Sequence, residues 1–439
     1  MIGFRKYILG KPTCLFRVQL GLVLILLLSS LPLQGQSLDD YLQIAAENNP
    51  ALKASYATYE ASLERISQEG ALPNPELSFG IYLQDMATLM GDQKMNASIM
   101  QRFPWFGSLQ ASKDQASLMA QAKFQEFEMT KYALFFDVKK SYYKVFMLHH
   151  HQMIAGKNVQ LLKILERLAL NKFKGGEPSK GRMADVLRVQ SNVKEMEALI
   201  IQLEDDVKLE KVRFNSILNC AEETPVHLDS TFLENELLLN KELVLDSILH
   251  ASPQMKKLEV EGLAYQKQGE VAQKAGMPSF GLGLSYMVNS PRLPSGDVSS
   301  ATGYRPGGMG HNMVMPMVSV SLPIYRKQYA AAKRESEKYR EVTAYEKEDL
   351  YNSLKLKSDE LFNEIHKAER NKKLYHDQVS LLERSLELLL TEYSSSEGSF
   401  EDVITVQRQL LEFEMKVAEE SVRKLTAIAE LEMLMSRRL

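Results

Sequence analysis

Methionine and histidine side chains gather in two short regions of this sequence, and they are the residues best suited to chemistry. The two groups are Met86, Met90, Met95 and Met100, and Met309, His311, Met313, Met315 and Met317. Thioether sulfur and imidazole nitrogen are ligands that suit Cu(I) and Ag(I). Methionines also face lipid or fill loops without any metal, so both interpretations stay open. The candidates for metal binding are Met309, His311 and Met313, and the sequence alone assigns no metal site.

Motifs typical of enzymes are missing from the sequence. It contains no P-loop, no zinc-spaced set of cysteines and histidines, and no GxSxG elbow. The stretch GLGLSY (281–286) has two of the three glycines of a dinucleotide-binding loop and no helix after it. Consecutive residues of a helix point to different faces, so we expect His149, His150 and His151 to form a solvated patch. We therefore predict a protein that is not an enzyme and needs no cofactor.

The first 36 residues have the pattern of a secretory signal peptide. They contain Arg5, Lys6, Lys11 and Arg17 and no acidic residue, and the apolar run LGLVLILLLSSLPL follows. This run is shorter than the ~20 residues that span a bilayer, and a small-residue site comes after it. We therefore predict a signal peptide over 1–36, with an uncleaved anchor as the alternative.

The composition is that of a globular protein, with 45% hydrophobic and 25% charged residues. The formal net charge is −3 and becomes more negative once the basic leader is removed, so nothing indicates nucleic-acid binding. Cys14 lies in the predicted leader, which leaves Cys220 as the other cysteine. Because one cysteine cannot form an intrachain disulfide, stability must come from packing and assembly.

The chain repeats itself, which predicts two structural units with the same order of elements. A shift of 203 residues aligns NNPALKA (48–54) with ASPQMKK (251–257). A shift of 219 residues aligns Pro104 with Pro323, because the segment 288–316 is longer than its counterpart. We predict one repeat over 37–235 and a second over 236–439.

Each repeat contains a predicted β-hairpin, over about 75–104 and about 278–323. Apolar and small polar residues alternate in PELSFGIYLQ, as they do in SFGLGLSYMV of the second repeat. Strands with this alternation have one apolar and one polar face. The segments MNASIMQRF (95–103) and MVMPMVSVSL (313–322) supply the partner strands.

A very long helix is predicted after each hairpin, over about 108–171 and about 326–391. The first stretch holds no proline and a single glycine, and the second holds neither. At ~1.5 Å per residue each helix would be roughly 95–100 Å long, so it must pack lengthwise against others. A tip turn and a shorter returning helix follow each of them, over about 182–219 and from about 400 to the C-terminus.

The corner between strand and helix is present twice, as RFPWFGSL (102–109) and SLPIYRKQ (321–328). Proline ends a strand ladder because it lacks a donor, and its fixed φ suits the first turn of a helix. Aromatic residues are typical of the lipid headgroup boundary. The predicted membrane-corner residues are Pro104, Trp105, Phe106, Pro323 and Tyr325.

Four strands with one apolar face cannot close on themselves within one chain. In lipid every backbone polar group must be paired, which for strands requires a closed barrel. Several copies must therefore share one barrel, and three copies with twelve strands would leave a lumen for solutes. We predict a mainly α-helical fold with a small β part. Long antiparallel helical hairpins would form a tunnel, and four strands per chain would join a shared transmembrane β-barrel.

The order of helix, hairpin, long helix, glycine-containing turn and returning helix, present twice, resembles the TolC family of outer-membrane efflux proteins. The resemblance covers essentially all of the chain after the signal peptide. It rests on NNP (48–50), Pro75, FPWFG (103–107), LPIYR (322–326), and the turns that end in Asp185-Val-Leu and Asp402-Val-Ile. It implies a homotrimer embedded in outer-membrane lipid, with a helical tunnel in the periplasm. It also implies a periplasmic adaptor (membrane fusion) protein and an inner-membrane pump of the resistance-nodulation-division type.

The resemblance further implies roles for the two turns at the far end of the helices. These turns would dock the adaptor and gate the tunnel. The residues of this predicted tip site are Phe173, Gly175, Gly176, Asp185, Tyr393, Gly398 and Asp402. The two acids also suit the first turns of the returning helices, and both interpretations stay open.

The predicted function is that of an outer-membrane exit duct in a tripartite efflux system. The methionine-rich regions favour metal cations such as copper or silver over drugs as the exported solutes. One alternative is the outer-membrane channel of a type I protein secretion system, which would share these features. A second alternative is a periplasmic coiled-coil adaptor, which would explain long helices but not two amphipathic hairpins with aromatic corners.

Overall fold

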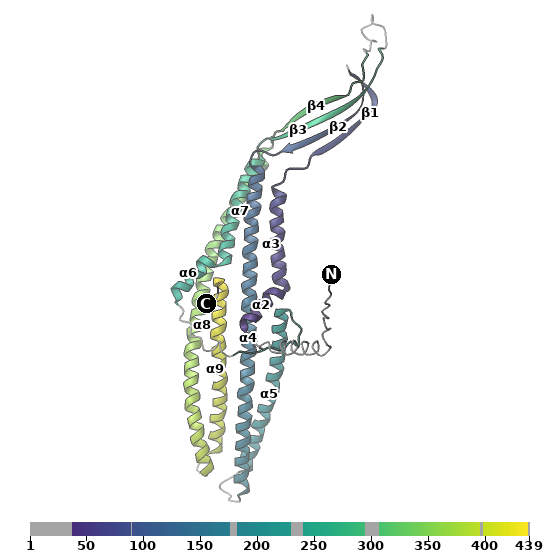
Figure 1. The fold of residues 1–439 in the computed structure, drawn as a ribbon. Helices are drawn as coiled ribbons and strands as arrows, with labels where there is room; N and C mark the ends of the chain where they lie inside the picture. The colour runs from purple at the N-terminus through teal and green to yellow at the C-terminus, as the bar shows by residue number, and fades with distance from the viewer. Residues whose placement is uncertain are drawn as a thin grey trace, which may run out of the picture.

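The computed structural model describes residues 37–88, 90–175, 182–229, 240–294, 307–395 and 398–437 of the chain. The molecule is elongated, with a β-sheet at one end and long helices that extend away from it (Figure 1). The predicted signal peptide over 1–36 lies outside the described residues, so it stays a prediction.

The first half of the chain begins with two helices, continues with two strands and ends with two longer helices. These elements are α2 (Leu38–Asn48), α3 (Pro50–Glu69), β1 (Glu76–Thr88), β2 (Gly91–Phe103), α4 (Ser108–Lys174) and α5 (Met183–Leu218). Ser37 caps α2, because its hydroxyl accepts a hydrogen bond from Asp40 N–H. The Asp40 carboxylate in turn accepts a hydrogen bond from Ser37 N–H at 2.8 Å, which completes a capping box.

The second half has the same order of elements. They are α6 (Lys241–Ala251), α7 (Pro253–Ala275), β3 (Ser279–Ser290), β4 (Met313–Ser321), α8 (Arg326–Ser395) and α9 (Phe400–Met435). The long helices α4 and α8 have 67 and 70 residues, and each extends a few residues beyond its predicted end. The predicted boundary between the repeats, at 235 and 236, falls in a segment outside the described residues and stays a prediction.

The four strands form one antiparallel sheet in the order β1-β2-β3-β4. Both predicted hairpins are present. In addition β2 pairs with β3 from Phe103 opposite Phe280 to Asp92 opposite Ser290, which the sequence did not predict. The two halves of the chain therefore build one continuous sheet, with β1 and β4 as its edges.

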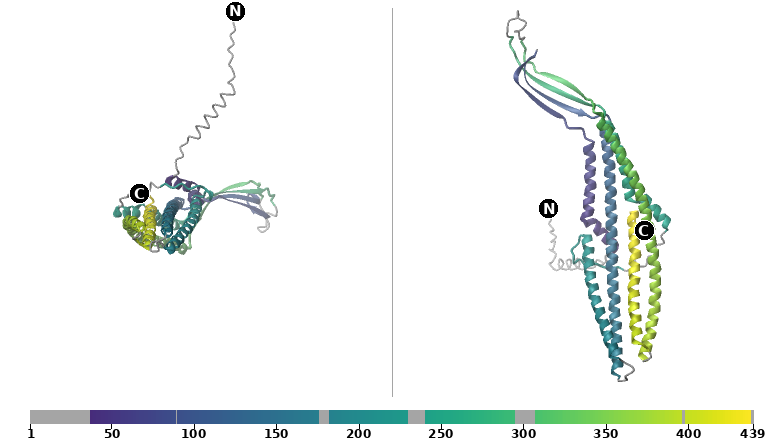
Figure 2. Two further views of the ribbon diagram at one scale, coloured as in Figure 1. Left: turned by 90° about the horizontal axis from the view of Figure 1, so that it is seen from below. Right: turned by 180° about the vertical axis from the view of Figure 1, so that it is seen from behind.

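The long helices pack lengthwise, as their patterns predicted. Helix α4 packs against α3, α5, α7 and α9, and α8 packs against α7 and α9. Away from the sheet, the α4–α5 hairpin and the α8–α9 hairpin lie side by side, and both views of Figure 2 show this arrangement. Across the parts of the chain that the structure describes, none of the helices has an apolar stretch long enough to cross a membrane.

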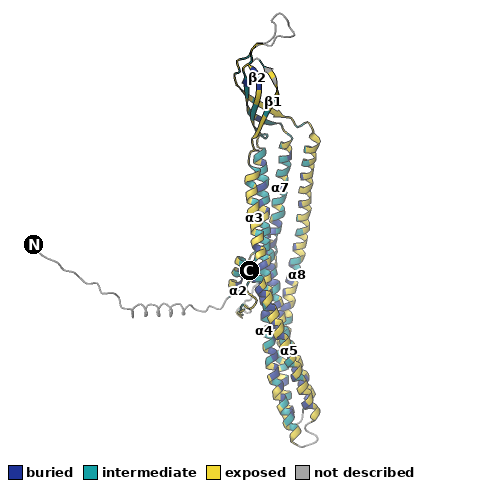
Figure 3. Ribbon diagram, turned by 90° about the vertical axis from the view of Figure 1, so that its right-hand side faces the viewer, coloured by how far each residue is buried: buried dark blue, intermediate teal, exposed yellow. Residues whose placement is uncertain are grey.

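Helices from both halves meet in the buried core. Tyr41 of α2 packs edge-on against Phe214 of α5 with 5.0 Å between ring centroids, and Tyr142 of α4 lies in the same cluster. Exposed residues recur along α3 and α8 in a single chain (Figure 3). The prediction of a mainly helical fold with long antiparallel helical hairpins and a small four-stranded β part is confirmed.

Candidate functional site

The sheet has one apolar and one polar face. Its apolar side chains are uncovered in the single chain: Leu83 is 96% exposed, Ile81 76% and Val318 74%. Apolar residues exposed in such number indicate a partner surface or a lipid environment. The opposite face carries hydroxyl and amide groups, and the hydroxyls of Ser78 and Ser98 lie 2.7 Å apart on neighbouring strands. The alternation seen in the sequence is thus expressed as two chemically different faces.

A buried ion pair holds the end of the sheet that lies farthest from the helices. The Arg292 guanidinium donates to the Asp92 carboxylate at 2.8 Å and to the Thr88 carbonyl at 3.0 Å. Arg292 and Gly308 also exchange two backbone hydrogen bonds of 2.9 Å. These contacts clamp the segment 307–312 of the second half onto the β1–β2 turn of the first.

The two strand-to-helix corners line one pocket of about 360 Å³, to which Pro104 and Pro323 both contribute. Helix α4 begins at Ser108 and α8 at Arg326, at the predicted starts, so each proline ends its strand and a short turn leads into the helix. Gly107 (φ 74°) makes the first of these turns in the left-handed conformation, which glycine adopts without strain.

The corner aromatics form a group at the junction of sheet and helices. Phe106 is 77% exposed and Tyr325 82%, whereas Trp105 is half-buried. The Trp105 ring stacks on Phe280 of β3, with 6.0 Å between centroids and an interplanar angle of 27°. Contact of these rings with lipid headgroups stays a prediction.

The last turns of α4 and α8 and the first turns of α5 and α9 lie at the end of the molecule opposite the sheet (Figure 1). All four helices contribute to one buried apolar cluster there, the tip cluster. Its buried members are Leu162, Leu165, Ala169, Val186, Val189, Val193, Leu386, Tyr393, Phe400, Val403, Ile404 and Leu410. The tip cluster therefore joins the two helical hairpins to each other.

Tyr393 of α8 contacts residues of its own hairpin and of the opposite one. It is 4% exposed, and its ring lies 5.3 Å from that of Phe400 on α9 of its own hairpin. The Lys172 ammonium of α4 lies 4.0 Å from the Tyr393 ring centroid and donates a hydrogen bond to the Tyr393 carbonyl. Burial raises the pKa of the Tyr393 hydroxyl, and the nearby Asp185 carboxylate raises it further. Within the described part of the chain this buried hydroxyl has no hydrogen-bond partner.

Asp185 and Asp402 lie in the first turns of α5 and α9, as the sequence allowed. Their surroundings differ. Asp185 is 7% exposed and pairs with Arg182 at 3.2 Å, whereas Asp402 is exposed. A carboxylate in a first turn stabilises the helix N-terminus, which accounts for both positions. A role of these acids in a constriction stays a prediction.

The glycines of the predicted tip differ from one another. Gly175 has a φ of −67°, which any residue adopts, so the backbone at this position does not require glycine. A Cβ at Gly398 would come 2.9 Å from the Tyr393 backbone nitrogen, so that position does require glycine. Phe173 is 44% exposed next to the turn. Gly176 lies outside the described residues.

The metal candidates lie at and just before the start of β4, with exposed side chains. Met309 is 81% exposed and Met313 38%, and His311 is exposed with its carbonyl accepting a 2.8 Å hydrogen bond from the Asn289 amide. Among the residues with a described placement, no group of three or more His, Cys, Asp or Glu could hold a metal ion. Metal binding by Met309, His311 and Met313 stays a prediction.

The three consecutive histidines do not form the solvated patch that we expected. His149 is exposed and His150 half-buried, but His151 is 7% exposed and its Nε2 lies 3.1 Å from the Met415 carbonyl of α9. Burial lowers the pKa of His150, and the neighbouring His151 lowers it further. The packing of α9 against α4 buries this side of the helix, which the local sequence pattern does not show.

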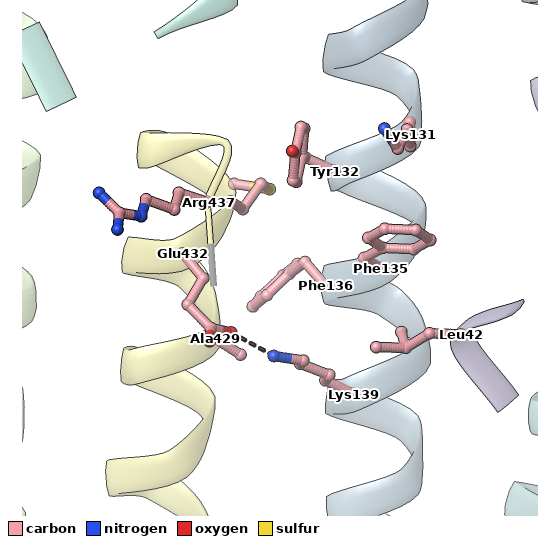
Figure 4. A pocket seen from close by; sticks show the side chains of 10 residues that line it. Leu42, Lys131, Tyr132, Phe135, Phe136, Lys139, Ala429, Glu432 and Arg437 are labelled. Carbon is pink, nitrogen blue, oxygen red and sulfur yellow. Dashed lines mark hydrogen bonds and ion pairs between the residues drawn. The ribbon is translucent and has the colours of Figure 1, made fainter. Parts of the chain in front are cut away.

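A pocket of about 260 Å³ lies between α4 and the end of α9 (Figure 4). Tyr132, Phe135 and Phe136 of α4 line it, and Figure 4 shows the Lys139 ammonium paired with the Glu432 carboxylate across it. Each of these two side chains is 13% exposed, so the pair is buried. Sequence reasoning missed this pair because its members lie 293 residues apart.

Comparisons with known proteins agree with this architecture. Residues 41–219 match the family model described as outer membrane efflux protein. No curated protein matches the sequence. The outer-membrane channel OprN has a TM-score of 0.71 at 15% identity, with 91% of this chain and 89% of that chain covered. The outer membrane protein VceC from Vibrio cholerae has a TM-score of 0.71 at 12% identity, with 91% and 96% covered. CusC has a TM-score of 0.69 at 14% identity, with 92% of each chain covered.

The family match over 41–219 and the channel fold of the chain together define the class of protein. Residues 41–219 resemble outer membrane efflux proteins, and the chain as a whole has the fold of outer-membrane channels. The predicted resemblance to the TolC family is confirmed, and the expected localisation in the outer membrane agrees with the proteins that the chain resembles.

Proposed function

We propose that three copies of this chain form an exit duct across the outer membrane. The duct receives solutes from an inner-membrane pump of the resistance-nodulation-division type through a periplasmic adaptor, and its long helices form a tunnel in the periplasm. The observation that carries the proposal is the four-stranded sheet. It has an exposed apolar face and, among the described residues of the single chain, two edges without a partner strand.

The sheet edges require partners if this sheet lies in lipid. Strands β1 and β4 each have a neighbouring strand on one side, so their other sides present N–H and C=O groups for pairing. Strands are stable in a membrane when a closed barrel pairs all of their backbone N–H and C=O groups. In the proposed trimer, β4 of one copy pairs with β1 of the next. Twelve strands then enclose a lumen, whereas the eight strands of a dimer would be filled by side chains.

The tip cluster supports a duct that can be closed at its periplasmic end. The contact of Lys172 with Tyr393 and the shared tip cluster connect the α4–α5 hairpin to the α8–α9 hairpin there. Separation of the two hairpins would widen the end of the tunnel. In the proposed mechanism the adaptor docks at the tip next to Phe173 and Gly398 and favours the separated state.

The proposed cargo is a metal cation such as copper or silver, and drugs are the second candidate. In the proposed barrel the polar face of the sheet lines the lumen, and methionines lie on this face. Thioether sulfur favours soft cations over hard ones. An outer-membrane channel for type I protein secretion would use the same barrel and tunnel. An exported protein, however, would not require methionines on the polar face of the sheet. A periplasmic adaptor would not need an apolar sheet face.

Electrical recording from purified protein tests the proposed duct. Protein extracted from outer membranes in detergent is expected to have the mass of three mature chains and to give discrete conductance steps in planar lipid bilayers. Recovery as a monomer that is soluble without detergent and does not conduct would overturn the proposal.

Deletion of the gene is expected to lower tolerance to copper and silver more than tolerance to drugs, while the export of proteins stays unchanged.

A further inference from the structure

The polar face of the sheet carries a group of methionines that the strand register brings together. We name it the methionine ladder, and its members are Met100 on β2, Met287 on β3, and Met313, Met315 and Met317 on β4. Met100 and Met317 both pair with Gly283, so they stand in one row on either side of a glycine. Met287 and Met313 stand directly opposite each other on neighbouring strands.

Two glycines of β3 make room for the Met100 side chain. A Cβ at Gly283 would come 2.9 Å from Met100 Cε and 3.1 Å from its sulfur, and a Cβ at Gly281 would also come 3.1 Å from the sulfur. The Met100 sulfur lies 3.8 Å from the Ser319 hydroxyl oxygen on β4. The Met100 side chain therefore crosses β3 and reaches the strand that carries three of the other ladder residues.

The ladder runs along the strands. Alternate residues of a strand are ~6.6–6.8 Å apart, so Met317, Met315 and Met313 recur at that interval toward the outer end of the sheet. Opposed side chains on neighbouring strands have Cβ atoms ~4.5–5.5 Å apart, which allows two sulfurs to contact one small ion. Core packing does not account for these methionines, because Met313 is 38% exposed and Met315 40%.

We propose that the methionine ladder is a transit site for soft monovalent cations, Cu(I) or Ag(I), on their way through the barrel. This inference rests on the proposed function, in which the polar face lines the lumen. Thioethers are neutral and soft, so they bind these ions and leave Mg²⁺ and Ca²⁺, which prefer oxygen ligands, unbound. Successive sites with few sulfurs each bind weakly enough to release the ion to the next one, as conduction requires.

The ladder differs from the metal candidates that the sequence suggested. Of those candidates, Met313 belongs to it, whereas Met309 and His311 precede the start of β4. Met95 supplies a matched control, because it pairs with Ile81 and Val288 on the apolar face of the same sheet. In the proposed barrel the Met95 side chain faces away from the lumen.

Silver binding to the purified full-length protein tests the ladder. All variants carry Cys220→Ser, which removes the one thiol of the chain after the predicted leader. One variant changes all five ladder residues to leucine, which nearly conserves volume, and the control carries Met95→Leu. Equilibrium dialysis is expected to show at least tenfold weaker Ag(I) binding for the ladder variant and unchanged binding for the control. X-ray absorption at the silver edge is expected to show sulfur neighbours in the parent protein.

Equal Ag(I) binding by the parent and the ladder variant would overturn the inference, and so would an equal loss in the Met95→Leu control. The proposed duct is tested separately, through trimer mass and conductance without metal. A parent protein that binds Ag(I) through sulfur but never conducts would contradict the duct and leave the metal site standing. A conducting trimer whose Ag(I) affinity does not depend on the ladder would contradict the metal site and leave the duct standing.

Discussion

The Lys172 ammonium lies 4.0 Å from the centre of the Tyr393 ring, although the two residues come from different halves of the chain. The same ammonium donates to the Tyr393 backbone carbonyl, so a single side chain of α4 holds both the ring and the backbone of α8. A cation–π contact is worth about 2 kcal/mol where it is removed from water. The link between the two hairpins at the tip can therefore be weakened by one substitution.

Replacement of the ring is expected to loosen the tip. Tyr393→Leu keeps an apolar side chain in the tip cluster and the backbone carbonyl that Lys172 contacts, but it removes the ring contacts with Lys172 and Phe400. We expect open events of the channel in planar bilayers to become about 2- to 30-fold more frequent, which corresponds to about 0.5–2 kcal/mol. The control is Tyr345→Leu on the same helix, because Tyr345 is 70% exposed. Equal opening by both variants would contradict the role of Tyr393.

The depth of Trp105 in the membrane can be measured directly, since it is the one tryptophan of the chain. Its place at the strand-to-helix corner predicts a position at the lipid headgroup boundary. Lipids brominated near the headgroup are expected to quench its fluorescence more strongly than lipids brominated deep in the acyl chain. Stronger quenching by the deep bromines, or none by either lipid, would show that this corner does not lie at the boundary.

The buried pair of Lys139 and Glu432 is expected to contribute strongly to stability. Lys139→Met removes one charge partner of the largely buried Glu432 carboxylate, and such a loss costs about 1–3 kcal/mol of unfolding free energy. The double variant Lys139→Met/Glu432→Met removes both charges and is expected to recover most of this loss. Chemical denaturation of the detergent-solubilised protein measures both effects. A double variant as unstable as the single variant would show that the loss of charge pairing does not cause the destabilisation.

Stability is expected to depend on pH through Glu414. Burial raises the pKa of this carboxyl, and the Glu383 carboxylate raises it further. A raised pKa in the folded state means that ionisation disfavours folding, so this cost is present at neutral pH and disappears as the pH falls below the ordinary carboxyl range. Glu414→Gln is therefore expected to raise the melting temperature by about 1–3 °C at pH 7 and to leave it unchanged near pH 4. The exposed Glu419→Gln serves as the control, and an equal rise in that variant would argue against burial as the cause.

Local sequence patterns predicted most of the helices and strands of the fold. The proline-free stretches predicted α4 and α8 to within a few residues, and the alternation in PELSFGIYLQ and SFGLGLSYMV predicted both hairpins. The pairing of β2 with β3 was not predictable in this way, because residues about 190 positions apart meet in register. The methionine ladder escaped detection for the same reason. Alternation assigns a face within one strand, but it does not say which residues of two strands stand opposite each other.

The candidate site was predictable in part. Glycine and acid patterns located both turns of the tip, and the family resemblance singled out Tyr393. The contact with Lys172 and the buried pair of Lys139 and Glu432 depend on how the two halves of the chain pack. The spacing of residues along the sequence does not indicate this packing. His151 illustrates the same point, because α9 covers a part of α4 that appears polar in the sequence.

Imaging of the protein in lipid nanodiscs by electron microscopy tests the central proposal most directly. We predict three copies around one closed ring of strands, with β4 of each copy hydrogen-bonded to β1 of the next and Leu83 and Val318 toward the lipid. A particle in which each chain buries its own four strands, with no ring shared among copies, would contradict this account.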